Sequence, residues 1–515
     1  MVDDGSGQAD LTGIMAELAG ADARIRHIGF RKNRGIALAS NAALKSASGE
    51  FIAFLDHDDA LEPAALEVML RAKAATGARL LYSDEDKISA SGALSEPHFK
   101  PDFNARLLLE VNYICHFVLL EASLLLQLGG LAKGYDGAQD HELLLRASEI
   151  LTPQQIHHVP EILYHWRKTA SSTAAAGSAA KPQAAAAGVA AVSAHLARRA
   201  LPARVSSRGG LTCYRVDWQP IAAQKVGVSI LVPFRDHVEM TSQCIKAIRQ
   251  HTRDMEYEII LLDNWSTTAE AEAFTTAQAN LPNTQVLKIP EPFNFSRLNN
   301  LGAQAAKHPF MLFLNNDVIV SDPAWLRTML NECVVNPRVG AVGAKLLYPE
   351  GTVQHAGVVL GVGGVADHGF RGIPGGAPGY VMRAMLAQQI SAVTAACMLV
   401  RKSAFNEVGG FDASELSVAF NDIDLCVKLN NAGWQIIFTP DAVAEHRESH
   451  SRGDDFNDQK IARFMLENEV MRTRHAAMLP HDPFYNPHFS REGGVYRELR
   501  LLAPEDLAKF SRPPG

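Results

Sequence analysis

The chain has 515 residues, and at roughly 100–200 residues per domain this length predicts two to four domains. With 47% apolar and 20% charged residues it is neither disordered nor collagen-like. Its formal net charge of −7 lacks the basic excess of a protein that binds phosphate backbones, so nucleic acid is not an expected partner.

The six cysteines are scattered without a C-x-x-C pair, which excludes a zinc cluster or a disulfide framework and favours a reducing compartment. The first residues carry neither a basic nor an apolar signal segment. The most apolar stretch, Leu107–Leu128, contains Glu110, Asn112, His116 and Glu121 and is too polar to span a bilayer. We expect a cytoplasmic protein whose membrane contact, if it has one, is peripheral.

Short β-rich runs alternate with helical ones along the chain. In chain order, the runs are strand 50–55, helix 63–74, strands 79–82 and 228–232, helix 237–250, strands 258–262 and 309–314, helix 323–334 and strand 392–400. This alternation predicts a parallel sheet covered by helices on both faces. An Ala/Ser-rich stretch, 169–182, predicts a linker, and the amphipathic run 183–199 predicts a connecting helix.

The chain repeats itself. Residues 2–6 (VDDGS) resemble 262–266 (LDNWS) at a spacing of 260, and residues 54–58 (FLDHD) resemble 313–317 (FLNND) at 259, a spacing that also relates Asn41 to Asn300. Residues 129–131 (GGL) match 409–411 (GGF), and 139–142 (QDHE) match 421–424 (NDID), at 280 and 282. Four landmarks in the same order predict two homologous domains, with boundaries at 1–205, including the linker and connecting helix 169–205, and 206–515, ending in a helical tail.

The spacings carry two further predictions. The second domain gains 23 residues between the landmarks, and the glycine-rich stretch 357–379 is the candidate for an inserted mobile loop that orders over the ligands as a lid; a surface loop or a partner contact is the alternative. The first strand of the second domain, which ends at Pro233, has no counterpart in the first domain. We therefore expect the first domain to lack its first strand and helix, as in a truncated or mis-started chain.

Clustered acids follow a strand in each half. Asp56 and Asp58 stand where a strand ends, and Asp317 is the equivalent acid of the second half. Carboxylates at the C-terminal edge of an open α/β sheet can hold Mg²⁺ or Mn²⁺ on a diphosphate. A solvated turn is the alternative, and the recurrence of one acid in both halves weakens it.

Other acids also recur. Asp3 and Asp263 follow a strand, where an acid can accept hydrogen bonds from a nucleoside or simply form a turn. Asp140 and Asp422 head amphipathic helices, as a capping residue or as a general base. His165 and His446 follow these acids by 25 and 24 residues, and each is a candidate to complete the metal shell or an ordinary core histidine.

The order of these motifs resembles the family 2 glycosyltransferases of the GT-A fold, over nearly the whole chain and twice. More closely, residues 82–87 (YSDEDK), 99–102 (FKPD), 163–167 (LYHWR), 292–300 (PFNFSRLNN) and 446–449 (HRES) resemble the tandem enzymes that build O-antigen and related bacterial surface polysaccharides. The fold expected from this resemblance is α/β: two tandem GT-A domains of Rossmann-like type, the first without its N-terminal strand and helix.

The resemblance implies a role for each residue. It implies inverting transfer of a sugar from a nucleotide-diphosphate donor to a hydroxyl of a glycan or lipid-linked glycan acceptor, with Mg²⁺ or Mn²⁺ as cofactor. The implied residues are Asp422 and Asp140 as bases; Asp317, His446, Asp58, Asp56 and His165 at the metal; and Pro233, Asp263, Asn264, Asn300, Asp3, Asp4 and Asn41 at the donor. The second domain, with its complete motif order, is the expected active site.

Three alternatives remain at this stage. The first domain is a non-catalytic module that binds the acceptor or braces the second domain, or the whole chain is a truncated, inactive fragment. A phosphatase using Asp56 and Asp58 is disfavoured, because Ala60 stands where that motif has Thr or Val and because Asn315 replaces the nucleophile in the repeat.

Overall fold

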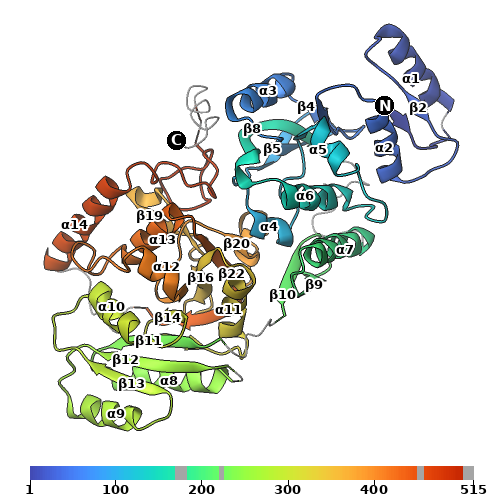
Figure 1. Cartoon of the computed structure of the whole chain (residues 1–515). Coiled ribbons are helices and arrows are strands. Elements are labelled where there is room, and N and C mark those ends of the chain that lie inside the picture. Colours follow the sequence, from blue (N-terminus) through green and yellow to red (C-terminus); the bar gives the residue numbers. More distant parts are fainter. Residues whose placement is uncertain are drawn as a thin grey trace. The chain divides into compact units, whose positions relative to one another are not determined.

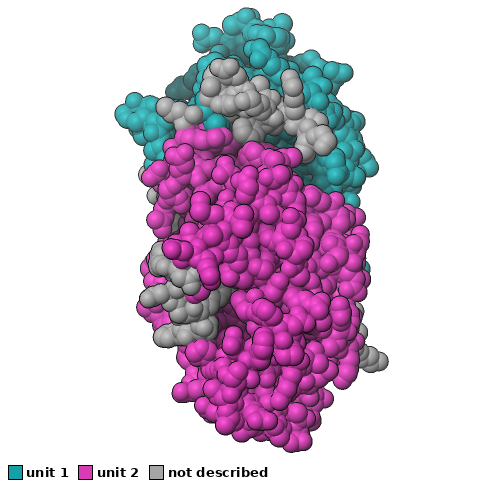
Figure 2. Space-filling view, turned by 90° about the vertical axis from the view of Figure 1, so that its left-hand side faces the viewer, with its two compact units in different colours: residues 1–216, 502–515 teal, residues 217–501 magenta. Residues whose placement is uncertain are grey.

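The structure is a computed structural model that describes residues 1–7, 9–168, 182–219, 226–253, 255–448, 458–500 and 502. The described chain divides into two compact units, Met1–Val216 and Asp217–Leu501, coloured separately in Figure 2. Residues 169–181 of the predicted linker lie outside the described residues. The first unit ends later than the predicted residue 205, because the Tyr214 ring packs over Gly188 of helix α7 (Pro182–Arg198) and stacks on His141 at 5.7 Å.

Unit 2 is built on one large mixed sheet (Figure 1). Its main strand order is β13-β12-β11-β14-β21-β16-β22-β15. The bounds are β11 Val228–Phe234, β12 Tyr257–Asp263, β13 Thr284–Lys288, β14 Phe310–Leu314, β15 Val318–Val320, β16 Val339–Leu347, β21 Cys397–Arg401 and β22 Gln435–His446. The first four strands are parallel, as the alternation predicts, whereas β21 is antiparallel to β14 and β16. The expectation of a wholly parallel sheet is therefore wrong.

Helices cover both faces of this sheet, as predicted. Alternate residues of β11 point to opposite faces, so that Ile230 packs with helices α8 (Val238–His251) and α11 (Trp325–Val335), while Leu231 packs with α10 (Phe295–Ala305) and α13 (Asn421–Asn431). Helices α9 (Ala269–Ala279), α12 (Lys402–Glu407) and α14 (Asp458–Arg474) complete the unit. Two apolar layers therefore fix the edge at which the parallel strands end.

The segment between β16 and β21 is packed rather than loose. It contains β17 (Val353–His355), β18 (Val358–Leu360), β19 (Ala366–His368), β20 (Gln388–Gln389) and two 3₁₀ turns, Val362–Gly364 and Tyr380–Met385. The Leu360 N–H donates to Asp482 of the C-terminal segment at 2.8 Å, and the Phe370 ring stacks on Tyr496 at 4.8 Å. The prediction of a mobile loop is therefore wrong for 357–370, which contains buried core residues, whereas 371–379 is exposed or half-buried.

Unit 1 repeats the part of this sheet that runs from β14 to β15. The order β3-β7-β5-β8-β4, with β6 beside β5, matches β14-β21-β16-β22-β15. The bounds are β3 Phe51–Ala53, β4 Ala60–Leu61, β5 Leu80–Ile88, β6 Leu94–His98, β7 Val118–Glu121 and β8 Ile156–Arg167, with helices α3 Ala65–Thr76, α4 Ala105–Glu110, α5 Ala122–Gln127 and α6 Gln139–Ile150, and the hairpin β9 Ala203–Ser207 and β10 Tyr214–Trp218.

The strand that corresponds to β11 is missing from the described part of unit 1. Strands β1 (Val2–Asp3) and β2 (Ile28–Gly29) form a separate parallel pair, flanked by helices α1 (Ala9–Ala21) and α2 (Ile36–Ser46), and β3 pairs with β7 alone. In unit 2, β11 joins the two corresponding parts by pairing with both β12 and β14. Within the described residues, β3 therefore has no neighbour in the position that β11 takes beside β14.

Candidate active site

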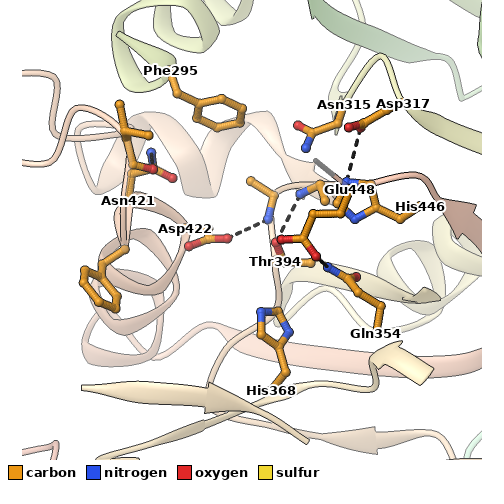
Figure 3. A pocket seen from close by; sticks show the side chains of 14 residues that line it. Phe295, Asn315, Asp317, Gln354, His368, Thr394, Asn421, Asp422, His446 and Glu448 are labelled. Atoms are coloured by element: carbon orange, nitrogen blue, oxygen red, sulfur yellow. Dashed lines mark hydrogen bonds and ion pairs between the residues drawn. The ribbon is translucent and has the colours of Figure 1, made fainter. Parts of the chain in front are cut away.

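A cavity of about 190 Å³ opens in unit 2 where β14 and β22 end and β15 and α13 begin (Figure 3). Its walls combine three acids, two histidines, amides and aromatic rings. The lining residues are Phe295, Asn315, Asp317, Gln354, His368, Thr394, Ala395, Ala396, Val418, Phe420, Asn421, Asp422, His446 and Glu448. The expected base and the expected metal ligands of the second domain thus lie in one cavity.

Asp317 and His446 form a buried pair at one side of the cavity. Val318 of β15 lies opposite His446 of β22, so that the preceding residue, Asp317, is beside the imidazole. The distance from His446 Nε2 to Asp317 Oδ1 is 3.2 Å, and the Arg447 N–H donates to the Asp317 carbonyl at 3.0 Å. His446 Nδ1 is buried without a hydrogen-bond partner among the described residues. A carboxylate and an imidazole at this distance are a donor set that Mn²⁺ and related divalent cations accept.

This pair is only a partial ligand set. No group of three or more His, Cys, Asp or Glu side chains in the described residues is arranged to hold a metal ion. A divalent cation at Asp317 and His446 would therefore need further oxygen ligands from a bound molecule or water, which is how Mg²⁺ is commonly held on phosphates.

Asp422 enters the cavity from the first turn of α13, on the side away from Asp317 (Figure 3). Its Oδ2 accepts the Ala395 N–H at 2.9 Å and its Oδ1 accepts the Ile423 N–H at 2.9 Å. Two backbone donors and the helix N-terminus hold this carboxylate in one orientation. A fixed carboxylate facing a cavity is suited to accept a proton from a bound hydroxyl.

His368 lies beneath Asp422 and pairs with a second buried imidazole. His368 Nδ1 is 2.9 Å from His355 Nδ1, so one ring donates and the other accepts. Burial lowers the pKa of His368, against the opposing charges of Asp422 and Asp367. Burial also lowers the pKa of His355 well below its usual value. We conclude that this pair is neutral near pH 7.

The other predicted donor residues of unit 2 lie at the ends of β11 and β12. Asp263 accepts the Ser266 N–H at 3.0 Å, and Asn264 donates to the carbonyl of Glu291 at 2.8 Å, which ties the chain after β13 to this turn. Pro233 lies opposite Leu262 in the parallel register. These side chains shape the strand ends and do not line the cavity.

Asn300 has a structural contact. Its side chain donates to the Phe411 carbonyl at 2.8 Å and accepts the Phe411 N–H at 3.0 Å. Asn41 makes the same pair of hydrogen bonds with Leu131, at 2.8 and 2.9 Å. Both polar groups of each amide therefore hold the Gly-Gly turn, and this contact explains why the repeat preserves an asparagine.

In unit 1, the first acids also serve local structure. Asp3 accepts the Ser6 N–H at 2.9 Å, which lowers the pKa of its carboxyl. Asp4 accepts the N–H groups of Arg34 and Gly35 at 2.8 and 2.9 Å, at the start of α2. Both carboxylates satisfy free donors of a turn or of a helix N-terminus.

The predicted equivalence of His165 and His446 is wrong. In unit 2, Ile319 lies opposite Glu445. In unit 1, Ala60, which the 259-residue spacing relates to Ile319, lies opposite His165. His165 therefore corresponds to Glu445, one residue short of the expected place, and a shift of one residue turns a strand side chain to the other face.

The contacts of His165 agree with this register. Its Nδ1 is 2.6 Å from Asp86 Oδ1 and its Nε2 is 3.4 Å from Glu62 Oε2. The position that corresponds to His446 belongs to Trp166. The two acids expected with His165, Asp56 and Asp58, therefore have no imidazole from this strand in the place that His446 takes in unit 2.

Aromatic rings stand where unit 2 has small cavity-lining side chains. His116 corresponds to Ala396 at the 280-residue spacing of the Gly-Gly landmark, and its ring stacks on Tyr164 at 4.7 Å and lies 5.8 Å from Trp166. The Tyr164 hydroxyl donates to Asp59 at 2.5 Å. Asp140 heads α6, and burial raises the pKa of its carboxyl.

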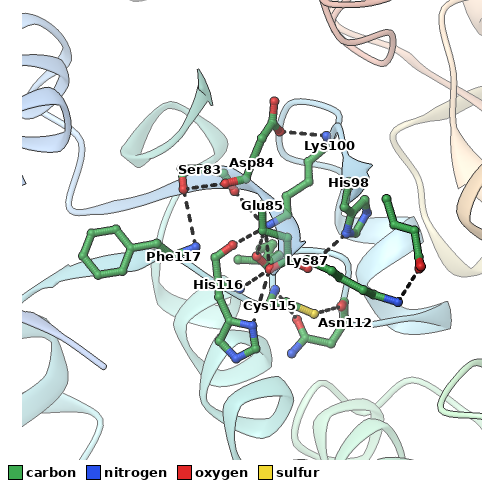
Figure 4. Close-up of polar contacts among 12 residues, drawn as sticks. Ser83, Asp84, Glu85, Lys87, His98, Lys100, Asn112, Cys115, His116 and Phe117 are labelled. Atoms are coloured by element: carbon green, nitrogen blue, oxygen red, sulfur yellow. Dashed lines mark hydrogen bonds and ion pairs between the residues drawn. The ribbon is translucent and has the colours of Figure 1, made fainter. Parts of the chain in front are cut away.

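A buried polar cluster supports this arrangement (Figure 4). Glu85 Oε2 accepts the His116 N–H at 3.2 Å and lies 3.5 Å from Lys100 Nζ, and Lys100 also donates to the carbonyls of Ser83 and Ile114 at 2.7 Å. Burial would raise the pKa of Glu85, but the charge of Lys100 and the contact with His116 hold it well below its usual value. The cluster therefore fixes the segment that carries His116.

Comparison with known proteins identifies the family. The sequence pattern described as "Glycosyl transferase family 2" matches residues 1–125 and 229–409, which is more than half of the chain. The chain belongs to glycosyl transferase family 2. This result confirms the resemblance found in the motifs, and the chain is a glycosyltransferase with tandem GT-A-like domains.

Two curated relatives of this glycosyltransferase align along almost all of it. An uncharacterised protein of Sinorhizobium fredii, y4gI, is 40% identical over 96% of the chain and 54% of its own length. The O-antigen biosynthesis protein RfbC of Myxococcus xanthus is 38% identical over 95% of the chain and 38% of its own length. An N-acetylglucosaminyl-diphospho-decaprenol L-rhamnosyltransferase of Mycobacterium tuberculosis is 27% identical over 38% of the chain and 68% of its own length. The chain thus spans about half or less of the first two relatives.

Sequence reasoning missed several cavity residues of this glycosyltransferase. His368 belongs to the segment 357–379 predicted as a loop, and Gln354 lies just before it in β17. Glu448, which accepts from Gln354 at 3.3 Å, follows the expected metal ligand His446 by two residues. The available signal for Glu448 was the strand period of two, which continued past His446 at the end of β22 places Glu448 on the same side as His446.

None of the described helices is long and apolar enough to cross a bilayer.

Proposed function

We propose that unit 2 transfers a sugar from a nucleotide-diphosphate donor to a hydroxyl of a growing cell-surface polysaccharide, with inversion at the anomeric carbon. The observation that supports this most is the single cavity that holds the Asp317–His446 pair on one side and Asp422 on the other. Transfer to a sugar hydroxyl needs both a stabilised leaving group and a base.

The donor side of the cavity suits a diphosphate. Mg²⁺ or Mn²⁺ at Asp317 and His446 would supply the positive charge that a leaving diphosphate needs. The paired side chains orient each other and are buried, which limits competition from water. The turns held by Asp263 and Asn264 lie at the ends of β11 and β12, the edge where open α/β sheets take nucleotides.

The acceptor side suits direct displacement. Asp422 is oriented by two N–H donors, and it would take the proton of the attacking hydroxyl as the new bond to the anomeric carbon forms and the bond to the diphosphate breaks. One carboxylate acting as a base favours a single displacement, hence inversion.

For unit 1 we propose a non-catalytic role in binding the acceptor or supporting unit 2. Trp166 stands in the place of His446, and His116 stands where unit 2 has an alanine. Each difference changes the part of unit 1 that corresponds to the proposed donor site. The polysaccharide role draws support from the O-antigen biosynthesis relative.

The matched aspartates of the two units provide the test. In the whole chain with Mn²⁺ and a panel of nucleotide sugars, we expect Asp422→Asn to lower sugar transfer by about 10²–10⁴-fold, and Asp140→Asn to leave it within about twofold of the unmodified rate. Equal transfer by Asp422→Asn and the unmodified protein would exclude the assigned base. Loss of transfer in Asp140→Asn alone would move the active site to unit 1.

A further inference from the structure

Unit 2 contains a second cavity beside the first. It has a volume of about 440 Å³, within the range of roughly 300–1,000 Å³ typical of small-molecule sites. Its walls come from the segment 367–380 and from residues 493–497 of the C-terminal segment. His368 lines both cavities, so the two cavities adjoin at this side chain.

The wall of the second cavity is a packed aromatic stack. The Tyr496 ring lies 4.8 Å from Phe370 at an interplanar angle of 13° and 5.6 Å from Tyr380 at 11°. The Phe489 ring meets Tyr380 edge-on at 4.9 Å. Because each ring is held by another, this wall does not need to order when a ligand binds.

Both signs of charge line the same cavity. Arg371 and Arg497 are exposed at the surface, and Asp367 is partly buried. The Arg371 side chain donates to the Tyr348 hydroxyl at 3.0 Å, and Arg497 donates to the Arg371 carbonyl at 3.3 Å, so each guanidinium group is held by a contact of its own. Guanidinium donors beside a carboxylate acceptor match a neutral molecule rich in hydroxyls, which both donates and accepts hydrogen bonds.

The segment that forms this cavity belongs to unit 2 alone. Between β5 and β7, unit 1 has only β6 and the short helix α4 among its helices and strands. Between β16 and β21, unit 2 has four strands and two 3₁₀ turns, and the C-terminal segment packs on them. The second cavity is thus an addition to the unit that carries the complete Asp317, His446 and Asp422 set.

We propose that the second cavity binds the sugar residues of the acceptor glycan that precede the attacking hydroxyl. This inference rests on the proposed function of the first cavity. Arg371, Arg497 and Asp367 would hydrogen-bond the sugar hydroxyls, and the aromatic wall would pack against the apolar faces of the rings. The bound chain then ends at His368, with its terminal hydroxyl at Asp422.

The test compares acceptors of increasing length. The probes are the methyl glycosides of L-rhamnose, D-mannose and D-glucose, each as mono-, di- and trisaccharide, with the whole chain, Mn²⁺ and the donor that shows turnover. We expect kcat/KM to rise at least about tenfold from mono- to trisaccharide in one series, which corresponds to about 1.4 kcal/mol. This gain should fall to about twofold or less in Arg497→Gln and Asp367→Asn. Arg472→Gln, an exposed arginine on α14, is the matched control and should keep the gain.

Saturation-transfer NMR with the same trisaccharides measures binding without turnover, so the result does not depend on the donor. A gain or NMR signal that persists in both cavity variants overturns the proposal, as does a protein that binds no trisaccharide better than its monosaccharide. Absence of donor turnover in the unmodified protein, with trisaccharide binding retained and lost in the variants, would instead contradict the proposed function and leave the sugar site standing.

Discussion

Glu467 of α14 holds the loop that borders the cavity containing Asp422, and its replacement by glutamine is the sharpest test of how the C-terminal helix supports the proposed site. Its carboxylate accepts hydrogen bonds from the Ser417 N–H at 2.9 Å, the Ser417 hydroxyl at 2.6 Å, the Val418 N–H at 3.1 Å and the Ala419 N–H at 2.6 Å. The side chain is buried, and the next residue, Phe420, lines the cavity just before Asp422.

The magnitude follows from these four contacts. A glutamine of the same shape keeps the oxygen that accepts three of these hydrogen bonds but turns its NH₂ group toward the Ala419 N–H, so one hydrogen bond is lost and the other three lose the charge of their acceptor. Hydrogen bonds to a charged group contribute about 1.5–3 kcal/mol each, and we expect Glu467→Gln to lower the free energy of unfolding by about 3–5 kcal/mol. With about 2.1 cal/mol/K of unfolding entropy per residue, unit 2 of about 285 residues should melt roughly 5–8 °C lower.

The assay pairs calorimetry with kinetics. Glu469→Gln, two residues along the same helix and exposed, is the matched control and should change the melting temperature by less than about 1 °C. Because Glu467 acts through the loop before Asp422, we expect Glu467→Gln to lower kcat more than it raises the donor KM, below the melting transition. Equal melting temperatures for the two variants, or a loss confined to the donor KM, would refute this reasoning.

Three further predictions follow from single contacts. We expect Mn²⁺ with UDP or GDP to raise the melting temperature of unit 2, EDTA to abolish this shift, and His446→Ala to weaken the Mn²⁺ dependence by at least about tenfold; a shift that survives EDTA would contradict the metal site. Burial lowers the pKa of His158, but the contact with Asp84 outweighs it and raises this pKa to about 9. The stabilisation of unit 1 by protonated His158 is therefore complete below pH 6.5 and is lost as the pH rises to 9. The melting temperature of unit 1 should fall over this window, and a profile unchanged in His158→Gln would exclude the effect. Asn300→Ala removes two hydrogen bonds to Phe411 and should cost about 1–3 kcal/mol in urea unfolding without changing the donor KM; a raised KM at unchanged stability would return Asn300 to the donor site.

The fold could be predicted from the sequence because its repeat is strong and its parallel strands are marked by apolar runs. The run 228–232 became β11, as its apolar residues predicted. The reversed direction of β21 was not readable, since a short apolar run looks the same in a parallel and an antiparallel strand. The glycine content of 357–379 led to the prediction of a mobile loop. The prediction failed there because Val358 and Leu360 are buried and this segment packs against a C-terminal segment more than 100 residues away.

The candidate site was predictable in part for the same reason. Asp317 and Asp422 were found because an acid at a strand end and an acid at a helix start recur in both halves. Glu467 carried no such signal, because its role depends on which loop α14 meets, and only the packed chain shows that contact. Long-range packing, not local pattern, decides which polar side chains reach a cavity.

His165 shows how a one-residue error in spacing reverses a functional assignment. Its distance from Asp140 is 25 residues, against 24 between Asp422 and His446, and that difference looked negligible on a helix or loop. On a strand it is decisive, because successive side chains point to opposite faces. In this register His165 lies beside Asp86, and Trp166 stands where unit 2 has His446. The two halves therefore share a fold, while among the described residues only the second has an imidazole from this strand beside the acid, His446 beside Asp317.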